Sequence, residues 1–146
     1  MNGIVAMDMP SDLRLILVHK QKTSGRLRFL RLPHGIVAFT PLPPMSALMA
    51  HAASPQVVQH PAVFLQAAEA RLNLPAGSLM HESEFLATVD TPDGPVAMHL
   101  ASFTSIDPPF DEVAALGGKF IAITEAAGGM PVEMDLLRHA YEVLLG

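Results

Sequence analysis

Alternation and short apolar runs predict the first strands of this chain. Residues 13–19 (LRLILVH) are branched and apolar over a length too short for an independent helix, and residues 26–32 (RLRFLRL) begin with strict alternation. The polar segment 20–25 (KQKTSG) ends in glycine, so the two runs are predicted to form a hairpin. Residues 35–40 are predicted to add a short strand. The prolines at 41, 43 and 44 then interrupt the ladder, because proline has no N–H to donate.

Helical spacing and capping residues predict four helices. Over residues 61–74 the apolar positions 64, 65, 68 and 72 form one stripe, and Asn73 and Pro75 suit the end of a helix. Residues 131–145 carry a second stripe at positions 132, 136, 137, 140 and 144. A short helix is predicted after Asp107, its expected cap, and another over residues 45–53.

The remaining segments complete the expected architecture. Residues 84–90 and 95–104 are predicted to form a second hairpin around a Thr-Pro-Asp-Gly turn, and residues 119–124 (KFIAIT) a further strand. Residues 1–11 have no clear period and are expected to form an N-terminal arm. The order of strands and helices predicts one α/β (α+β) domain over residues 1–146, an α/β/α sandwich around a mixed sheet.

Composition narrows the classes of function. Half of the residues are hydrophobic and 16% are charged, which favours a homodimer or a buried partner face. No apolar run approaches the roughly 18 residues that cross a bilayer, and no signal peptide is evident, so we expect a cytoplasmic protein without a membrane partner. The absence of cysteine excludes disulfides, thiolate metal sites and a cysteine nucleophile.

Charge is unevenly distributed along the chain. Six of the nine basic residues lie between positions 14 and 31, and twelve of the fourteen acidic residues lie from position 69 onward. The basic segment is either an anion-binding face or the solvated face of a hairpin. A net charge of −5, one Tyr and no Trp argue against nucleic-acid binding.

Three short segments carry a resemblance to a known family. LPHG at residues 32–35 follows a strand, LNLP at 72–75 closes a helix, and FDEV at 110–113 precedes another strand. In this order, residues 13–145 resemble the Nudix hydrolase superfamily. The resemblance implies a Nudix-like sandwich that holds a nucleotide or another small anion near Arg28, Arg31, His34 and Gly35. At that place His34 is either a phosphate donor or acid–base group, or a solvated turn residue.

The catalytic motif of that family is degenerate in this chain. The family box reads G-x5-E-x7-R-E-U-x-E-E-x-G-U, where U is aliphatic and glutamates one helical turn apart hold a divalent metal. With Leu74 at the last position, the metal-binding glutamates fall on Ala70 and Arg71, and the final glycine falls on Asn73. An alanine cannot bind a metal and an arginine repels it, so ordinary Nudix hydrolysis is not expected.

Three functions remain open from the sequence. The first is a catalytically degenerate Nudix-like domain that serves as a ligand-binding or protein-interaction module and needs no cofactor. The second is a divergent Nudix-type hydrolase of a nucleoside-diphosphate-like substrate, with Mg²⁺ held by Glu69, Glu112 and Glu125 and with Glu112 as catalytic base. The third is an unrelated α+β oligomeric protein.

Histidines near the second hairpin form another candidate site. His81, Glu82, Glu84 and His99 meet if the strands of the hairpin pair across it, and imidazoles with carboxylates can bind a metal. The alternative is a set of unrelated polar surface residues.

Overall fold

A mixed seven-stranded sheet forms the centre of the molecule. The computed structural model describes residues 13–49, 61–126 and 129–145, and all statements on structure concern these ranges. The strands follow the order β3-β5-β6-β1-β2-β7, and β4 pairs with β6 as well. The elements are β1 (Leu13–Lys20), β2 (Leu27–Arg31), β3 (Ala47–Leu48), α1 (Pro61–Arg71), β4 (Leu79–His81), β5 (Ala87–Thr91), β6 (Gly94–Phe103), α2 (Phe110–Ala114), β7 (Lys119–Ile121), the 3-10 turn η2 (Ile123–Ala126) and α3 (Pro131–Leu145).

Strand β1 lies in the middle of the sheet and pairs on both sides. It runs antiparallel to β2, with Val18 opposite Phe29, and parallel to β6, with Ile16 opposite Leu100. Both faces of β1 are buried, which explains why its sequence is almost continuously apolar rather than strictly alternating. The two expected hairpins, β1–β2 and β5–β6, are present.

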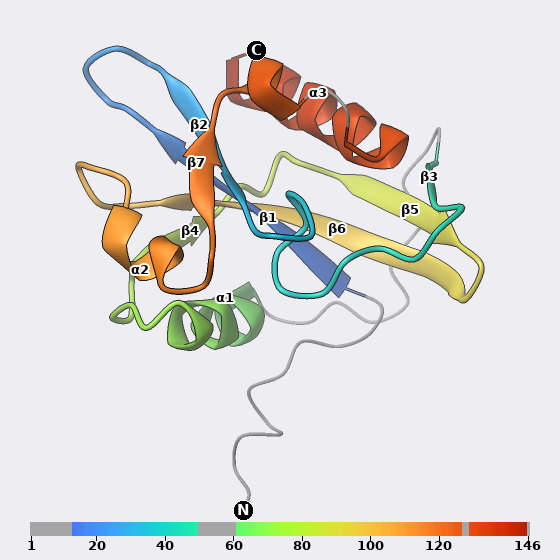
Figure 1. The fold of residues 1–146 in the computed structure, drawn as a ribbon, viewed down its shortest axis with the longest axis horizontal. Coiled ribbons are helices and arrows are strands. Elements are labelled where there is room, and N and C mark those ends of the chain that lie inside the picture. The colour runs from blue at the N-terminus through green and yellow to red at the C-terminus, as the bar shows by residue number, and fades with distance from the viewer. Residues whose placement is uncertain (1–12, 50–60, 127–128, 146) are drawn as a thin grey trace, which may run out of the picture.

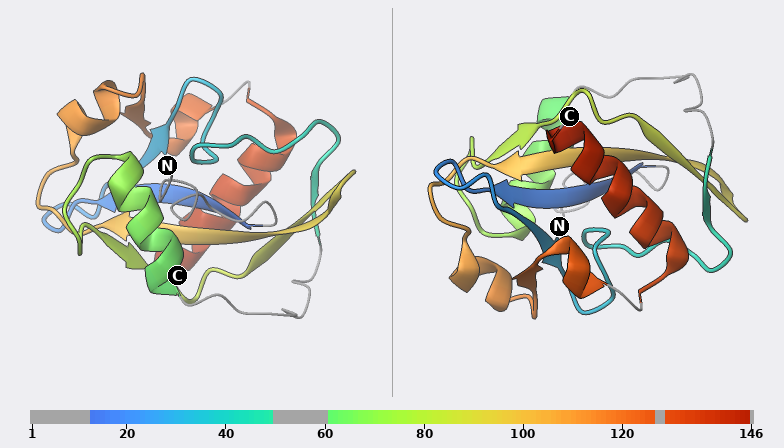
Figure 2. Two further views of the ribbon diagram at one scale, coloured as in Figure 1. Left: turned by 90° about the horizontal axis from the view of Figure 1, so that it is seen from below. Right: turned by 90° about the horizontal axis from the view of Figure 1, so that it is seen from above.

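Helices cover both faces of the sheet and make the expected α/β/α sandwich. Helix α3 lies across one face and α1 across the other (Figures 1 and 2). Two cores result. One contains Ile16, Val18, Phe29, Leu136 and Leu137, and the other contains Leu15, Leu17, Phe64, Leu65 and Leu72.

The helical stripes predicted for α1 and α3 are the faces that are buried. In α1 the buried stripe contains positions 64, 65 and 68, with Leu72 just after the helix, and in α3 it contains 132, 136, 137 and 140. None of the described helices combines the length and the apolar character that a bilayer crossing needs.

Several local predictions were wrong. Residues 35–40 make isolated bridges at Gly35 and Val37 rather than a strand, because positive φ angles at Gly35 and Phe39 turn the backbone out of a ladder. Residues 47–48 form strand β3 in place of the predicted short helix, and positions 50–53 of that prediction lie outside the described residues. Helix α2 is capped by Pro109 without a side-chain hydrogen bond, so Asp107 is not its cap. The expected arm, residues 1–11, also lies outside the described residues.

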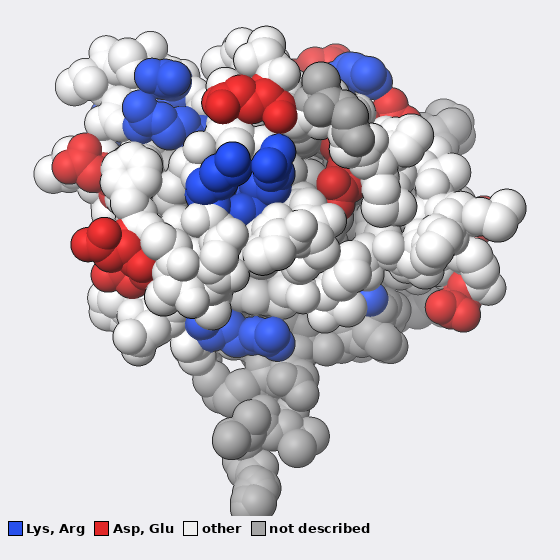
Figure 3. Space-filling model, in the orientation of Figure 1, with Lys and Arg blue, Asp and Glu red and all other residues white. Residues whose placement is uncertain are grey.

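Charge is interspersed on the face of the molecule shown in Figure 3. Groups of Lys and Arg are separated by groups of Asp and Glu, and no large surface of one sign is visible on this side. Recognition of a ligand on this face therefore depends on individual side chains rather than on a broad basic field.

Candidate functional site

A pocket of about 270 Å³ lies between the first turns of α3 and the loop that follows β2, together with the end of that strand. Arg31, His34 and Gly35 line it on one side, and Met130, Glu133 and Met134 line it on the other. The pocket is therefore built from two parts of the chain that are far apart in sequence, and it combines apolar walls with a few polar groups, as small-molecule sites do.

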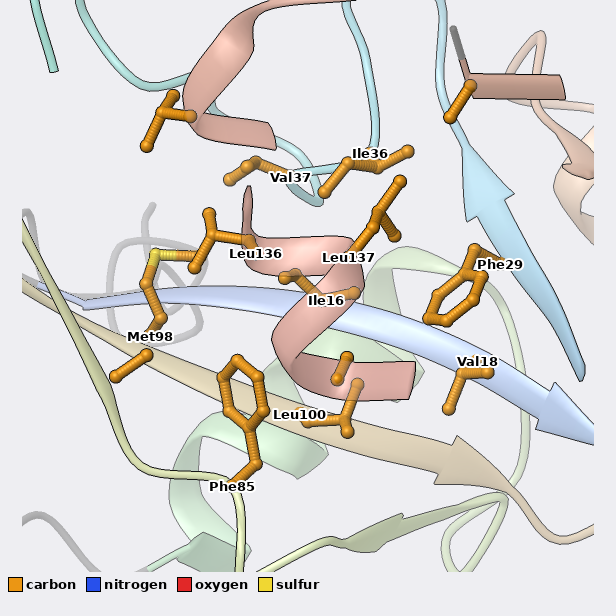
Figure 4. Packing of buried hydrophobic residues seen from close by; sticks show 14 of the residues in the cluster. Ile16, Val18, Phe29, Ile36, Val37, Phe85, Met98, Leu100, Leu136 and Leu137 are labelled. Atoms are coloured by element: carbon orange, nitrogen blue, oxygen red, sulfur yellow. The ribbon is translucent and has the colours of Figure 1, made fainter. Parts of the chain in front are cut away.

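The LPHG loop, residues 32–38, forms one wall and is held by several hydrogen bonds. Leu32 and Gly35 exchange backbone hydrogen bonds of 2.9 and 3.0 Å, and Nε2 of His34 lies 2.6 Å from the carbonyl oxygen of Val37. Ile36 and Val37 are buried and reach toward the core under α3 (Figure 4). The loop is thus a fixed wall, although it belongs to no strand.

Glu133 brings a buried carboxylate to the pocket from the first turn of α3. Its side chain is only 5% exposed, and its Oε2 atom has no hydrogen-bond partner among the described residues. Burial raises the pKa of Glu133, while the backbone N–H groups of Ile36 and Val37 and the nearby His34 oppose that rise. Glu133 therefore lines the pocket, and one of its carboxylate oxygens is buried without a donor among the described residues.

Gly35 permits the close approach of that carboxylate. A Cβ atom at position 35 would lie 2.5 and 2.6 Å from the two carboxylate oxygens of Glu133. The φ angle of Gly35 is 141°, in a region that side chains other than glycine rarely adopt. Loop and helix can meet in this way only because position 35 lacks a side chain.

Three of the four residues predicted to bind a ligand lie together at this pocket. They are Arg31, His34 and Gly35, which follow one another closely in the chain. Arg28 is not part of the lining, and its guanidinium lies 3.5 Å from the side-chain oxygen of Gln21. Glu133 was not among the predicted site residues. The sequence does contain a signal for its burial: Glu133 lies three positions before Leu136 and four before Leu137, on the same face of the helix as these buried leucines.

The three candidate metal ligands are not brought together. Glu69 is buried in α1, where its Oε2 accepts a hydrogen bond of 3.0 Å from the Leu79 backbone N–H. Glu125 accepts one of 2.9 Å from the Ala122 N–H, and Glu112, the candidate base, lines a separate hollow beside α2. Within the described ranges no three His, Asp or Glu side chains are grouped as a metal site requires. These residues do not fit the Mg²⁺ that the hydrolase alternative requires.

Two of the histidines suggested by the sequence do meet, but through a different pair of strands. His81 lies on β4, which precedes the second hairpin and pairs with β6, and its Nε2 is 3.2 Å from Nδ1 of His99. Burial lowers the pKa of both rings, that of His99 to about 4. Glu82 accepts a hydrogen bond of 2.6 Å from the hydroxyl of Ser102, whereas Glu84 is exposed.

A scan against models of protein families gives no match to this chain, and a search of curated proteins gives no similar sequence.

Proposed function

We propose that this chain is a Nudix-like ligand-binding module and that its ligand occupies the pocket between the LPHG loop and α3. Three features of the fold support the Nudix-like assignment. They are the order of the elements, the parallel pairing of β1 with β6 at the centre of the sheet, and the position of α1 and α3 on opposite faces. The chain keeps this scaffold while positions 70 and 71, which the motif assigns to metal-binding glutamates, hold Ala and Arg.

The unpartnered oxygen of Glu133 is the observation that carries the proposal. A buried acceptor without a donor destabilises a protein by about 1–3 kcal/mol. A ligand that donates a hydrogen bond to this oxygen recovers part of that free energy on binding. Arg31 lines the same pocket and forms no ion pair with the described residues. A small anion that also carries an N–H or O–H donor, such as a nucleotide, matches both groups.

The alternatives receive less support from the geometry. A metal-dependent hydrolase needs acidic side chains that converge on one ion. Two of the three candidates, Glu69 and Glu125, instead accept a hydrogen bond from a backbone N–H group. The homodimer and the cytoplasmic location stay predictions of the composition.

Thermal unfolding with a panel of nucleoside mono- and diphosphates, with and without Mg²⁺, tests the proposal. A ligand at a hundredfold excess over its Kd should raise the Tm by about 5–10 °C for a chain of this size, and Mg²⁺ should not be needed. Arg31→Gln should remove most of this shift. The matched control Arg28→Gln, on the same strand but outside the pocket, should keep it.

Two results would count against the proposal. Equal loss of the shift in both arginine variants would indicate general charge attraction rather than this pocket. Mg²⁺-dependent phosphate release that Glu112→Gln abolishes would instead support a hydrolase.

A further inference from the structure

The histidine pair on β4 and β6 lies outside the proposed ligand pocket and has a chemistry of its own. His81 is opposite Ala101 in the register, so His99 is its diagonal neighbour on the same face of the sheet. The ring of Phe64 from α1 packs against both imidazoles, with centroid distances of 5.6 Å to His81 and 4.7 Å to His99. The two strands and this aromatic ring hold the imidazoles next to each other.

The spacing of the facing nitrogens suits one shared ion. Nε2 of His81 and Nδ1 of His99 are 3.2 Å apart. With metal–nitrogen bonds of about 2.0–2.1 Å, this spacing corresponds to an N–metal–N angle of roughly 100°, close to the tetrahedral value. One ion can use both nitrogens once the rings turn so that the two lone pairs point to a common position, because the facing nitrogens now share a hydrogen bond.

The hydrogen between the two rings does not exclude a cation. Nε2 of His81 and Nδ1 of His99 share one hydrogen bond, so only one of these two nitrogens carries a hydrogen. The ring that now donates the hydrogen bond can carry its hydrogen on its other nitrogen, which frees the facing lone pair without net loss of a proton.

Imidazole nitrogen selects zinc, copper and nickel ions over magnesium or calcium, which prefer oxygen ligands. We propose that His81 and His99 form a two-histidine site for a divalent transition metal ion. The protein supplies two ligands, since no larger group of His, Asp or Glu occurs within the described residues, and water or an external ligand completes the coordination. The side chain of Glu82 lies beside His81 and adds a favourable negative charge.

Equilibrium dialysis of the untagged full chain against Zn²⁺ tests the site, with His81→Gln and His99→Gln as variants. Each should weaken binding at least about tenfold, because even changes in the partners of metal ligands lower affinity 10–100-fold. His139→Gln is the matched control. This histidine also packs on a ring, that of Phe85 at 5.0 Å, and bonds a backbone carbonyl, but it makes no hydrogen bond or ring contact with another histidine among the described residues. The control should bind Zn²⁺ as the unmodified chain does.

A second readout uses the unmodified chain alone, so it does not depend on whether a variant folds. The electron paramagnetic resonance spectrum of Cu²⁺ bound to that chain should show hyperfine coupling to two imidazole nitrogens. Zn²⁺ binding that is unchanged in both His81→Gln and His99→Gln would overturn the proposal. So would a Cu²⁺ spectrum without coupling to two nitrogens, even if a variant fails to fold.

Discussion

Replacing Gly35 by alanine tests whether the LPHG loop depends on the close approach of Glu133. The added Cβ would stand 2.5 and 2.6 Å from the carboxylate oxygens, so the buried side chain must move. The backbone at position 35, with φ of 141°, would also be strained by any side chain. The substitution therefore combines two effects that can be measured separately.

The expected loss of stability follows from those two effects. Backbone strain at such a conformation costs about 1–3 kcal/mol. Moving the carboxylate away from the N–H groups of Ile36 and Val37 leaves buried donors unsatisfied and costs a further 1–3 kcal/mol or so. We expect Gly35→Ala to lower the free energy of unfolding by about 2–6 kcal/mol in urea denaturation.

Gly94 provides a matched control for the strain alone. Its φ angle is 115°, and a Cβ there would meet nothing within 4 Å, so Gly94→Ala should lose only the strain component. In a Glu133→Ala background, Gly35→Ala should likewise fall to the loss seen at Gly94, which gives a coupling energy of about 0.5–3 kcal/mol. Equal losses at Gly35 and Gly94 in the unmodified background, or no coupling with Glu133, would refute this account of the loop.

Three further outcomes follow from other buried groups. Because burial raises the pKa of Glu133, the native state keeps this proton to higher pH than the unfolded chain does. Stability should therefore decline as the pH rises from the unfolded pKa through the raised one, and Glu133→Gln should flatten that decline in urea midpoints measured across the same range. Glu69→Ala removes the acceptor of the buried Leu79 N–H and should cost about 1–3 kcal/mol in urea unfolding, whereas Glu125→Ala, at an exposed carboxylate, should cost less. Leu136→Ala opens a cavity under α3 and should cost about 2–5 kcal/mol by the same measurement, and a loss below 1 kcal/mol or so would contradict the packing.

The sequence was informative where local spacing determines structure. In α1 and just after it, apolar residues recur at about every helical turn, at positions 64, 65, 68 and 72. This local pattern predicts the buried face without information from the rest of the chain. Residues 36–38 are different, because they are apolar for a tertiary reason. Ile36 and Val37 are buried in the core under α3, and Ala38 is buried in the core under α1. A short apolar run has the same sequence pattern in a β-strand and in a buried loop, so the pattern predicts a strand at residues 35–40 where the structure has a loop.

The candidate site was predictable only in part for a similar reason. Arg31, His34 and Gly35 are close in sequence, so one turn suffices to place them together. Arg28 is three residues before Arg31 on β2, an odd separation that directs the two side chains to opposite faces of the strand. The absence of Arg28 from the pocket is therefore predictable from the sequence. The presence of Glu133 in the pocket is not, because it depends on how α3, near the other end of the chain, packs on the sheet.

The two buried glutamates, Glu69 and Glu133, differ in whether the fold satisfies their carboxylate oxygens. Glu69 lies on α1, and its carboxylate accepts a hydrogen bond from the Leu79 backbone N–H, so this residue stabilises the fold. Glu133 lies on the other side of the sheet with an oxygen that no described group satisfies. Stability alone does not require a carboxylate oxygen without a donor at position 133, because burying an unpaired acceptor is unfavourable. A local departure from good packing that opens on a pocket is typical of a functional site, so a ligand should be sought beneath the LPHG loop before the α1 face of the sheet.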